Sequence, residues 1–204
     1  MQLYMFNKPK GCITARSDVA HKTVMDYFPE DIRKNCFPVG RLDKDTTGLL
    51  LITDDGKLLE SLMLPDKKVS KIYEFWAYGV LDEAKLNSLR EGIDIGRGRV
   101  ELTAPCEIEV MCQGTYGEYK DRMIQDECEE INHKGDFQKV VYGRITITQG
   151  KKHQVKRMLR AAGCYIVMLK RVAIGELCLD EGLESGDYKA ITVENSIGSI
   201  VLEE

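Results

Sequence analysis

The chain has 204 residues, of which 43% are hydrophobic and 30% are charged, and its formal net charge is −4. This apolar fraction supports a folded core and excludes a disordered chain, and the length suffices for one large domain or two small ones. No run approaches the roughly 20 apolar residues of a membrane helix, and the N-terminus lacks a secretory signal, so we expect a cytoplasmic protein. The sequence pI of about 5.6 by itself argues against a nucleic-acid partner.

The N-terminal part of the chain predicts short strands and helices with clear breaks between them. Pro9 and Gly11 end a first strand, and Pro29 ends a short helix whose apolar residues follow helical spacing. A continuous apolar run between Gly48 and Asp54 predicts a strand that is buried on both faces. The predicted elements here are a strand at 2–6, a helix at 24–28, a strand at 49–52 and a helix at 57–64.

The rest of the chain predicts more strands than helices, in runs rather than in strict alternation. Asp82 is expected to cap a helix that stops at Gly92, and Gly163 to stop a later helix. The polar, acidic stretch 112–136 exceeds an ordinary connection, so we expect an insertion, a lid or a mobile loop there. This pattern favours an α+β fold with a mixed, mostly antiparallel sheet. The predicted elements are strands at 70–80, 99–111, 140–148, 165–169 and 172–179, and helices at 82–91 and 151–162.

Seven cysteines and three histidines are spread widely along the chain. No two cysteines have the C-x-x-C spacing that zinc sites and thioredoxin-like motifs usually show. We therefore expect reduced, mostly buried thiols and no metal site.

The segment GRLDKDTTGLLLITDDG, residues 40–56, places acidic and hydroxyl side chains directly before the predicted buried strand. Its residues from Asp43 to Gly48 predict a tight loop, and loops fixed by a rigid strand often carry catalytic groups. For a short motif of this kind, the alternative is a turn that its own Asp and Thr side chains cap.

With Val39 in front of it, this segment resembles the signature of the RsuA family of ribosomal RNA pseudouridine synthases. Collinear similarity covers nearly the whole chain apart from residues 112–138. FNKPKG resembles the opening strand and turn of the family, KVSKIYEF the segment with its active-site tyrosine, GKKHQVKRMLRAAG its late helix, and MLKRVAIGELCLDEGLESGDYKAIT its closing strands.

The resemblance implies an enzyme that converts uridine to pseudouridine in RNA, without a cofactor or a metal. Asp43 falls on the position of the catalytic aspartate, Tyr73 on the tyrosine that packs against the target base, and Lys156 on the basic residue paired with the aspartate. Leu169 falls on the apolar residue that lines the base pocket. The other substrate-binding candidates are Arg41 and Thr47, which flank the aspartate, and His153 and Gln154, which precede Lys156.

These residue types suit the reaction, which breaks the bond from ribose C1′ to N1, rotates the base and rejoins it through C5. A carboxylate must be ionised to act as a nucleophile or a base, and a lysine beside it favours that form in a dry pocket. A tyrosine ring can stack on the detached base while it turns. The sequence leaves open whether Asp43 attacks the sugar or the base, or deprotonates the sugar.

The resemblance further implies the pseudouridine-synthase fold, a mixed and mostly antiparallel sheet with flanking helices around a central active-site cleft. We expect one catalytic domain over residues 1–204, with two subdomains of which the first ends near Ile52, and no S4 RNA-binding domain ahead of it. We expect a monomer, with no membrane association, whose partner is ribosomal RNA or a ribosomal subunit assembly intermediate.

Positive charge is concentrated in the late helix and in the strand that follows it. Residues 150–175 contain seven basic residues and no acidic ones, whereas residues 118–136 and 176–204 are acidic. RNA binding should therefore depend on one face of the protein, and His153 and Gln154 either contact phosphate or cap the preceding strand. The RNA-binding candidates are Lys151, Lys152, Arg157 and Arg160.

The sequence predicts isomerisation of a specific uridine in ribosomal RNA, and HQVKRM resembles the branch that modifies small-subunit ribosomal RNA. Two alternatives stay open. One is a pseudouridine synthase for large-subunit ribosomal RNA or transfer RNA, and the other is a non-catalytic RNA-binding assembly factor on the same fold. The joint presence of Asp43, Tyr73 and Lys156 argues against the second alternative.

Overall fold

The computed structural model describes residues 1–57, 68–128 and 135–192, and the chain divides into two compact units. Unit 1 comprises Met1–Lys71 and Lys170–Glu204, and unit 2 comprises Ile72–Leu169. The sequence placed the end of the first subdomain near Ile52, whereas the chain passes from unit 1 to unit 2 after Lys71. No helix in the described part is long and apolar enough to cross a bilayer.

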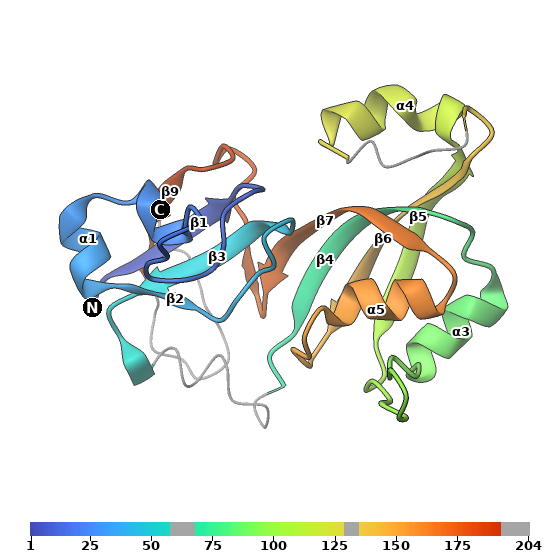
Figure 1. Cartoon of the computed structure of the whole chain (residues 1–204), viewed down its shortest axis with the longest axis horizontal. Coiled ribbons are helices and arrows are strands. Elements are labelled where there is room, and N and C mark those ends of the chain that lie inside the picture. Colours follow the sequence, from blue (N-terminus) through green and yellow to red (C-terminus); the bar gives the residue numbers. More distant parts are fainter. Residues whose placement is uncertain (58–67, 129–134, 193–204) are drawn as a thin grey trace. The chain divides into compact units, whose positions relative to one another are not determined.

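The described part of unit 1 contains a sheet and the short helices η1 and α1, and Figure 1 shows its strands β1, β3 and β9 in blue, cyan and red. The described elements are β1 (Leu3–Lys8), η1 (Val24–Tyr27), α1 (Glu30–Asn35), β2 (Phe37–Val39), β3 (Thr47–Thr53), the second half of β7 (Tyr165–Ile174), β8 (Leu177–Cys178) and β9 (Tyr188–Ala190). Their order in the sheet is β7-β3-β1-β9, with β2 also paired to β3 and β8 to β7. The β3–β7 pair is parallel, whereas the β1–β3, β1–β9, β2–β3 and β7–β8 pairs are antiparallel.

The core of unit 1 forms around β3, where Leu49, Leu50, Leu51 and Ile52 have no exposed surface. Successive side chains of a strand point to opposite faces, so burial of four in a row means that both faces of β3 are covered. Leu49 and Leu51 pack in one cluster that also contains Met5. The prediction of a strand buried on both faces is confirmed.

Unit 2 contains a second set of strands with three helices in its described part. The elements are β4 (Lys71–Tyr78), α3 (Glu83–Glu91), β5 (Glu107–Thr115), α4 (Tyr116–Gln125), β6 (Lys139–Ile147), α5 (Gln154–Ala161) and the first half of β7. The strand order is β5-β6-β4-β7, and β5 pairs antiparallel with β6. In Figure 1, α5 lies across these strands, and α4 lies at the end where β5 and β6 connect. The mixed α+β fold with a mostly antiparallel sheet and flanking helices is confirmed.

The predicted cap and stop signals of α3 act as expected. The Asp82 carboxylate accepts a hydrogen bond of 3.0 Å from the Lys85 amide, and Gly92 ends the helix at φ 109°. Gly163 follows α5 at φ 79°, so it also ends its helix in a conformation that favours glycine. The start of α5 differs from the prediction, because Lys151 lies in a turn and the helix begins at Gln154.

In the residues that the structure describes, the stretch 112–136 is more regular than the sequence predicted. Its first residues continue β5, and α4 follows with a capping box in which Glu118 accepts hydrogen bonds from the amide and hydroxyl of Thr115. Tyr116 and Met123 of α4 are buried against Trp76 of β4. The sequence did not predict this helix, because only two of its side chains are buried and the others are mostly polar. Trp76 is fully buried, and its indole nitrogen donates to the Asp126 carboxylate at 2.7 Å.

The closing strands also differ from the prediction, since β7 runs without a break where two strands were expected. The two predicted strands left out Lys170 and Arg171, but the Arg171 side chain is 3% exposed and its Nε donates to the Leu49 carbonyl at 2.8 Å. A buried arginine that meets a backbone acceptor does not interrupt a strand. The helix predicted at 57–64 lies outside the described residues but for its first position.

Candidate active site

Asp43 lies in the loop between β2 and β3, and hydrogen bonds from elsewhere in unit 1 fix the backbone of this loop. The Thr46 amide donates to the Asp43 carbonyl at 3.1 Å, which closes a turn. On the other side of the aspartate, Thr14 donates to the Leu42 carbonyl at 2.8 Å, and the Leu42 amide donates back to the Thr14 hydroxyl at 3.1 Å. The Asp43 side chain itself is half-buried. The loop therefore holds a carboxylate that is within reach of solvent on a backbone that is hydrogen-bonded on both sides.

A buried lysine supports the same loop from β1. Lys8 has no exposed surface, and its ammonium group donates to the carbonyls of Pro9 and Thr46 at 3.0 Å and of Lys44 at 3.4 Å. Burial lowers the pKa of Lys8, and nearby groups, among them Asp43, act in the opposite direction. The Gly11 amide also donates to the Lys44 carbonyl at 2.9 Å. Residues 8–11 thus hold the residues on both sides of Asp45 in place.

The start of β3 fixes the other end of the loop through a close approach of two backbones. Gly48 pairs with Arg171 of β7, and a Cβ at position 48 would lie 2.2 Å from the Arg171 carbonyl oxygen. Gly48 also has φ 95°, a conformation that side chains strongly disfavour. Only glycine fits this position, which explains the glycine directly after Thr47.

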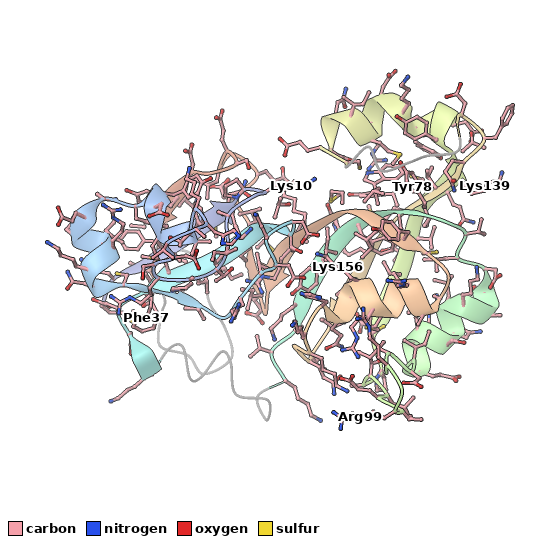
Figure 2. The ribbon with its side chains drawn as sticks, in the orientation of Figure 1. Lys10, Phe37, Tyr78, Arg99, Lys139 and Lys156 are labelled. Carbon is pink, nitrogen blue, oxygen red and sulfur yellow. The ribbon has the colours of Figure 1, made fainter. Side chains whose placement is uncertain are left out.

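The candidates in unit 2 lie on three elements. Tyr73 on β4 and Leu169 on β7 are both buried, with 8% and 5% of their surface exposed. Lys156 lies in the first turn of α5 and is half-buried. It is labelled in Figure 2. These three residues belong to unit 2, whereas Arg41, Asp43 and Thr47 belong to unit 1. The joint site of Asp43, Tyr73 and Lys156 therefore stays a prediction.

Gln154 and His153 shape the start of α5. The Gln154 side chain is 5% exposed, and its Oε1 accepts a hydrogen bond of 2.9 Å from the Lys151 amide. His153 is exposed and adopts a left-handed conformation at φ 51°. Of the two roles that the sequence left open for Gln154, these contacts favour capping. His153 presents its ring outside the core, where contact with a phosphate is sterically allowed.

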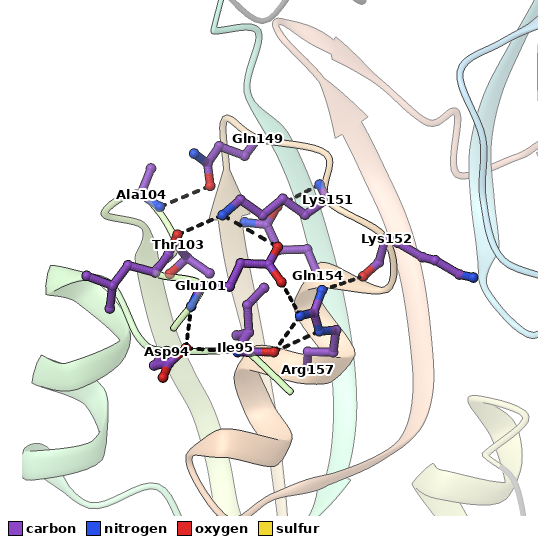
Figure 3. A network of polar contacts seen from close by, with 12 residues as sticks. Asp94, Ile95, Glu101, Thr103, Ala104, Gln149, Lys151, Lys152, Gln154 and Arg157 are labelled. Carbon is purple, nitrogen blue, oxygen red and sulfur yellow. Dashed lines mark hydrogen bonds and ion pairs between the residues drawn. The ribbon is translucent and has the colours of Figure 1, made fainter. Parts of the chain in front are cut away.

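A polar network ties α5 to the loop before β5, and Figure 3 shows it from close by. The Arg157 guanidinium donates to the Ile95 carbonyl and forms an ion pair with Glu101. Lys151 donates to the Leu102 carbonyl at 2.7 Å and lies 3.7 Å from Glu101. Hydrogen bonding from Arg157 holds the pKa of Glu101 below its usual range, so the carboxylate stays ionised near neutral pH.

This network divides the basic residues of the late helix into two groups. Arg157 and Lys151 are committed to contacts within the protein, whereas Lys152 and Arg160 are exposed. The segment 150–175 contains no acidic residue, but Glu101 reaches it from a distant part of the chain. Charge patterning along the sequence therefore overestimated the number of cations that are available to RNA.

The structural roles of Lys8, Glu101 and Arg171 could not be predicted from the sequence pattern. A lysine at the end of a strand is normally predicted to be exposed to solvent. For Lys8, the sequence offered only the family resemblance of the segment FNKPKG that contains it. All seven cysteines are free, as expected, but of these Cys12, Cys36 and Cys164 alone count as buried. In the described part of the chain, no group of three or more His, Cys, Asp or Glu residues is arranged to hold a metal ion.

Known proteins are similar to this chain in sequence and in fold. The family model described as RNA pseudouridylate synthase matches residues 2–161. The chain belongs to this family. It is 37% identical to the RNA pseudouridine synthase YtzG of Bacillus subtilis over 191 residues, which are 93% of this chain and 70% of the relative. It is 34% identical to ribosomal small subunit pseudouridine synthase A of Vibrio cholerae, over 96% of this chain and 72% of the relative.

A solved structure agrees with this assignment. A crystal structure of a pseudouridylate synthase superimposes with a TM-score of 0.75 and 32% sequence identity, and the match covers 94% of this chain and 70% of the other. Fold and sequence similarity therefore extend through both units of this pseudouridine synthase. The protein is an enzyme of the isomerase class.

Lys8→Met is expected to lower both the stability and the turnover of this pseudouridine synthase. Methionine keeps an unbranched apolar stem but donates no hydrogen bond to the three carbonyls that Lys8 contacts. Buried groups left without a partner cost about 1–3 kcal/mol each, and removal of the buried charge offsets part of this, so we expect a net loss of about 2–4 kcal/mol. Urea unfolding measures this loss, and Lys10→Met, at an exposed site labelled in Figure 2, is the control. Equal stability of the two variants would contradict a structural role for Lys8.

Proposed function

We propose that the protein converts a specific uridine of small-subunit ribosomal RNA to pseudouridine. The observation that carries the proposal is the likeness to proteins named ribosomal small subunit pseudouridine synthase A. Those of Haemophilus influenzae, Vibrio cholerae and Pseudomonas aeruginosa are 31% to 34% identical over at least 94% of this chain. The branch resemblance of HQVKRM in the late helix supports the same substrate.

Asp43 is proposed as the catalytic carboxylate, with Tyr73 stacking on the base and Lys156 keeping the carboxylate ionised. The support for Asp43 is its half-buried position on a loop that is hydrogen-bonded on both sides. A fixed backbone lets the carboxylate meet the reacting atoms without a cost in ordering the loop. The buried ring of Tyr73 and the buried side chain of Leu169 suit an apolar pocket for a base.

Arg41, Thr47 and His153 are proposed to position the nucleotide around the reacting base. Lys152 and Arg160, which are exposed on the same helix, are proposed to contact RNA phosphates. For Lys151, Gln154 and Arg157, the internal hydrogen bonds support a different proposal, in which they hold the RNA-binding surface in shape.

We propose that the enzyme acts as a cytoplasmic monomer on ribosomal RNA or on a subunit assembly intermediate, with no cofactor. The reaction rearranges bonds within one nucleotide and has no net oxidation, so the side chains above suffice for it in principle.

Mapping of modified uridines tests the substrate directly. The protein is incubated with ribosomal RNAs transcribed in vitro, which lack pseudouridine, as naked RNA and as reconstituted subunits, and with transfer RNA transcripts. Carbodiimide treatment and primer extension then locate each new pseudouridine as a stop. We expect one new stop, in small-subunit RNA.

The other outcomes separate the alternatives. A stop only in large-subunit RNA or transfer RNA would contradict the proposed substrate, whereas the proposed reaction, conversion of uridine to pseudouridine, would still hold. No stop in any RNA, together with rescue of ribosome assembly by the Asp43→Asn protein in a deletion strain, would instead identify a non-catalytic assembly factor.

A further inference from the structure

A cavity of about 480 Å³ lies in unit 2 between α5 and the loop that precedes β5. Three arginines line it, Arg97 from the loop and Arg157 and Arg160 from the helix, together with Asp94. None of the residues proposed for catalysis lines it. The cavity is therefore distinct from the proposed catalytic residues, and it adds Arg97 to the surface on which Arg160 is proposed to contact RNA.

The loop that carries Arg97 has a defined conformation. Two backbone hydrogen bonds, from Ile95 to Glu101 at 3.0 Å and from Thr103 to Ile93 at 3.1 Å, make it a small hairpin. Gly96 forms its tight turn, since a Cβ at this position would lie 1.8 Å from the Arg99 carbonyl oxygen. The arginines of the loop are thus held on a backbone whose turn admits little variation.

The Asp94 carboxylate lines the cavity and is also hydrogen-bonded within its own hairpin. Its Oδ1 accepts hydrogen bonds of 2.8 Å from the amides of Gly96 and Glu101. These bonds hold the pKa of Asp94 below its usual range. Its negative charge also acts on Arg157, so one acidic side chain faces three arginines in the lining of the cavity.

Arg157 fixes the hairpin to α5. Its guanidinium bridges the Ile95 carbonyl and the Glu101 carboxylate, and it also donates to the Lys152 carbonyl at 3.3 Å. Figure 3 shows this guanidinium lying between the helix and the hairpin. Arg157 thereby sets the relative position of the two elements that form the cavity.

Two cations of the cavity are left without internal partners. Arg97 and Arg160 are both exposed, and within the described residues neither side chain forms an ion pair or hydrogen bond. Arg99, which Figure 2 labels at the same hairpin, is exposed as well. The cavity thus presents two guanidinium groups that have no internal hydrogen bond or ion pair among the described residues, one from the hairpin and one from α5.

We propose that this cavity binds a backbone phosphate of the RNA substrate away from the nucleotide that is modified. Guanidinium groups bind phosphate oxygens with paired, charge-assisted hydrogen bonds, and Arg97 and Arg160 approach the cavity from two elements. Because Arg157 and the hairpin hold the backbones of both elements in place, binding has to order only the two arginine side chains. The proposal rests on the proposed function, since that function supplies the RNA.

The test uses the whole chain and small-subunit ribosomal RNA transcribed in vitro, with the double variant Arg97→Gln/Arg160→Gln. The matched control is Lys120→Gln/Lys139→Gln, which removes the same charge from exposed positions of α4 and β6 in the same unit. Filter binding over a range of salt concentrations gives the affinity and its salt dependence. Carbodiimide mapping with time gives kcat and KM.

We expect the cavity variant to bind RNA at least tenfold more weakly than the control, with the loss in KM rather than in kcat. Loss of one or two phosphate contacts should also lower the slope of log K against log salt by about 1–2. The same affinity and slope for the two variants would overturn the proposal, and so would a loss confined to kcat. If no RNA is modified by any form of the protein, the proposed function fails, whereas unchanged binding by an active enzyme refutes the phosphate site alone.

Discussion

Asp43→Asn is expected to reduce pseudouridine formation by about 10³-fold or more, because loss of an essential nucleophile or base typically costs this much. Asparagine matches the shape of aspartate but carries no charge and is neither a nucleophile nor a base at neutral pH. The backbone contacts of the loop, from Thr46 and Thr14, do not involve the Asp43 side chain. We therefore expect the midpoint of thermal unfolding to change little. Carbodiimide mapping with time measures turnover.

Asp45→Asn is the matched control for this substitution. Asp45 lies two residues further along the same loop, is exposed, and like Asp43 acts on the pKa of Lys8. Neutralising it changes the charge of the loop to the same extent without touching the proposed catalytic position. We expect the control to keep turnover within about threefold of the unaltered enzyme, a small effect for a surface charge. An Asp43→Asn protein that keeps a tenth of its activity or more would show that the carboxylate is not essential.

Gly48→Ala is expected to be the most destabilising of the substitutions considered, with a loss of at least about 4 kcal/mol, the range reserved for severe core disruptions. The added methyl group would overlap the Arg171 carbonyl oxygen at 2.2 Å, and φ 95° is strained for alanine. Relief requires β3 to move away from β7, which breaks their parallel pairing and the hydrogen bond from Arg171 to Leu49. Urea unfolding measures the loss, and an insoluble product would have the same meaning.

Two further glycines separate the causes of this loss. Gly11 has φ 90°, and no atom lies within 4 Å of the position that a methyl group would take, so Gly11→Ala measures backbone strain alone, about 1–2 kcal/mol. Gly150 has an ordinary φ and open space around it, so Gly150→Ala should change stability by less than about 0.5 kcal/mol. A Gly48→Ala protein no less stable than Gly11→Ala would contradict the close approach of β3 and β7.

Local patterns in the sequence predicted much of the fold. The apolar run from Leu49 to Ile52 became the strand buried on both faces, and Asp82 and Gly92 bound α3 as expected. Such signals depend on neighbours within a few residues, so they can be read along the chain. Elements without a strong local signal were missed, as α4 shows, because its two buried side chains contact strands from elsewhere in the sequence.

The candidate site shows the same division. The motif around Asp43 and the resemblance of the late helix pointed to the residues proposed for catalysis. The hydrogen bonds that hold the loop and the start of β3 could not be predicted. Lys8 donates to the carbonyl of Thr46, 38 residues away in the sequence, and Arg171 donates to the carbonyl of Leu49, 122 residues away. Every residue type carries a backbone carbonyl, so the residue types in the sequence do not indicate which carbonyl accepts such a hydrogen bond.

The net charge of the whole chain is a poor guide to whether this protein binds RNA. A total of −4 seemed to disfavour an RNA partner, and the sequence by itself corrected this by revealing an acid-free segment at 150–175. Which of its cations are available was decided by tertiary structure alone. Glu101 and the carbonyls of the hairpin bind Arg157 and Lys151, while Arg160 and the distant Arg97 line one cavity. The sequence by itself determined the family, the elements with strong local signals and the positive charge of residues 150–175. Long-range contacts determined which of these cations can bind RNA, because electrostatic pairing depends on distance in space and not on distance along the chain.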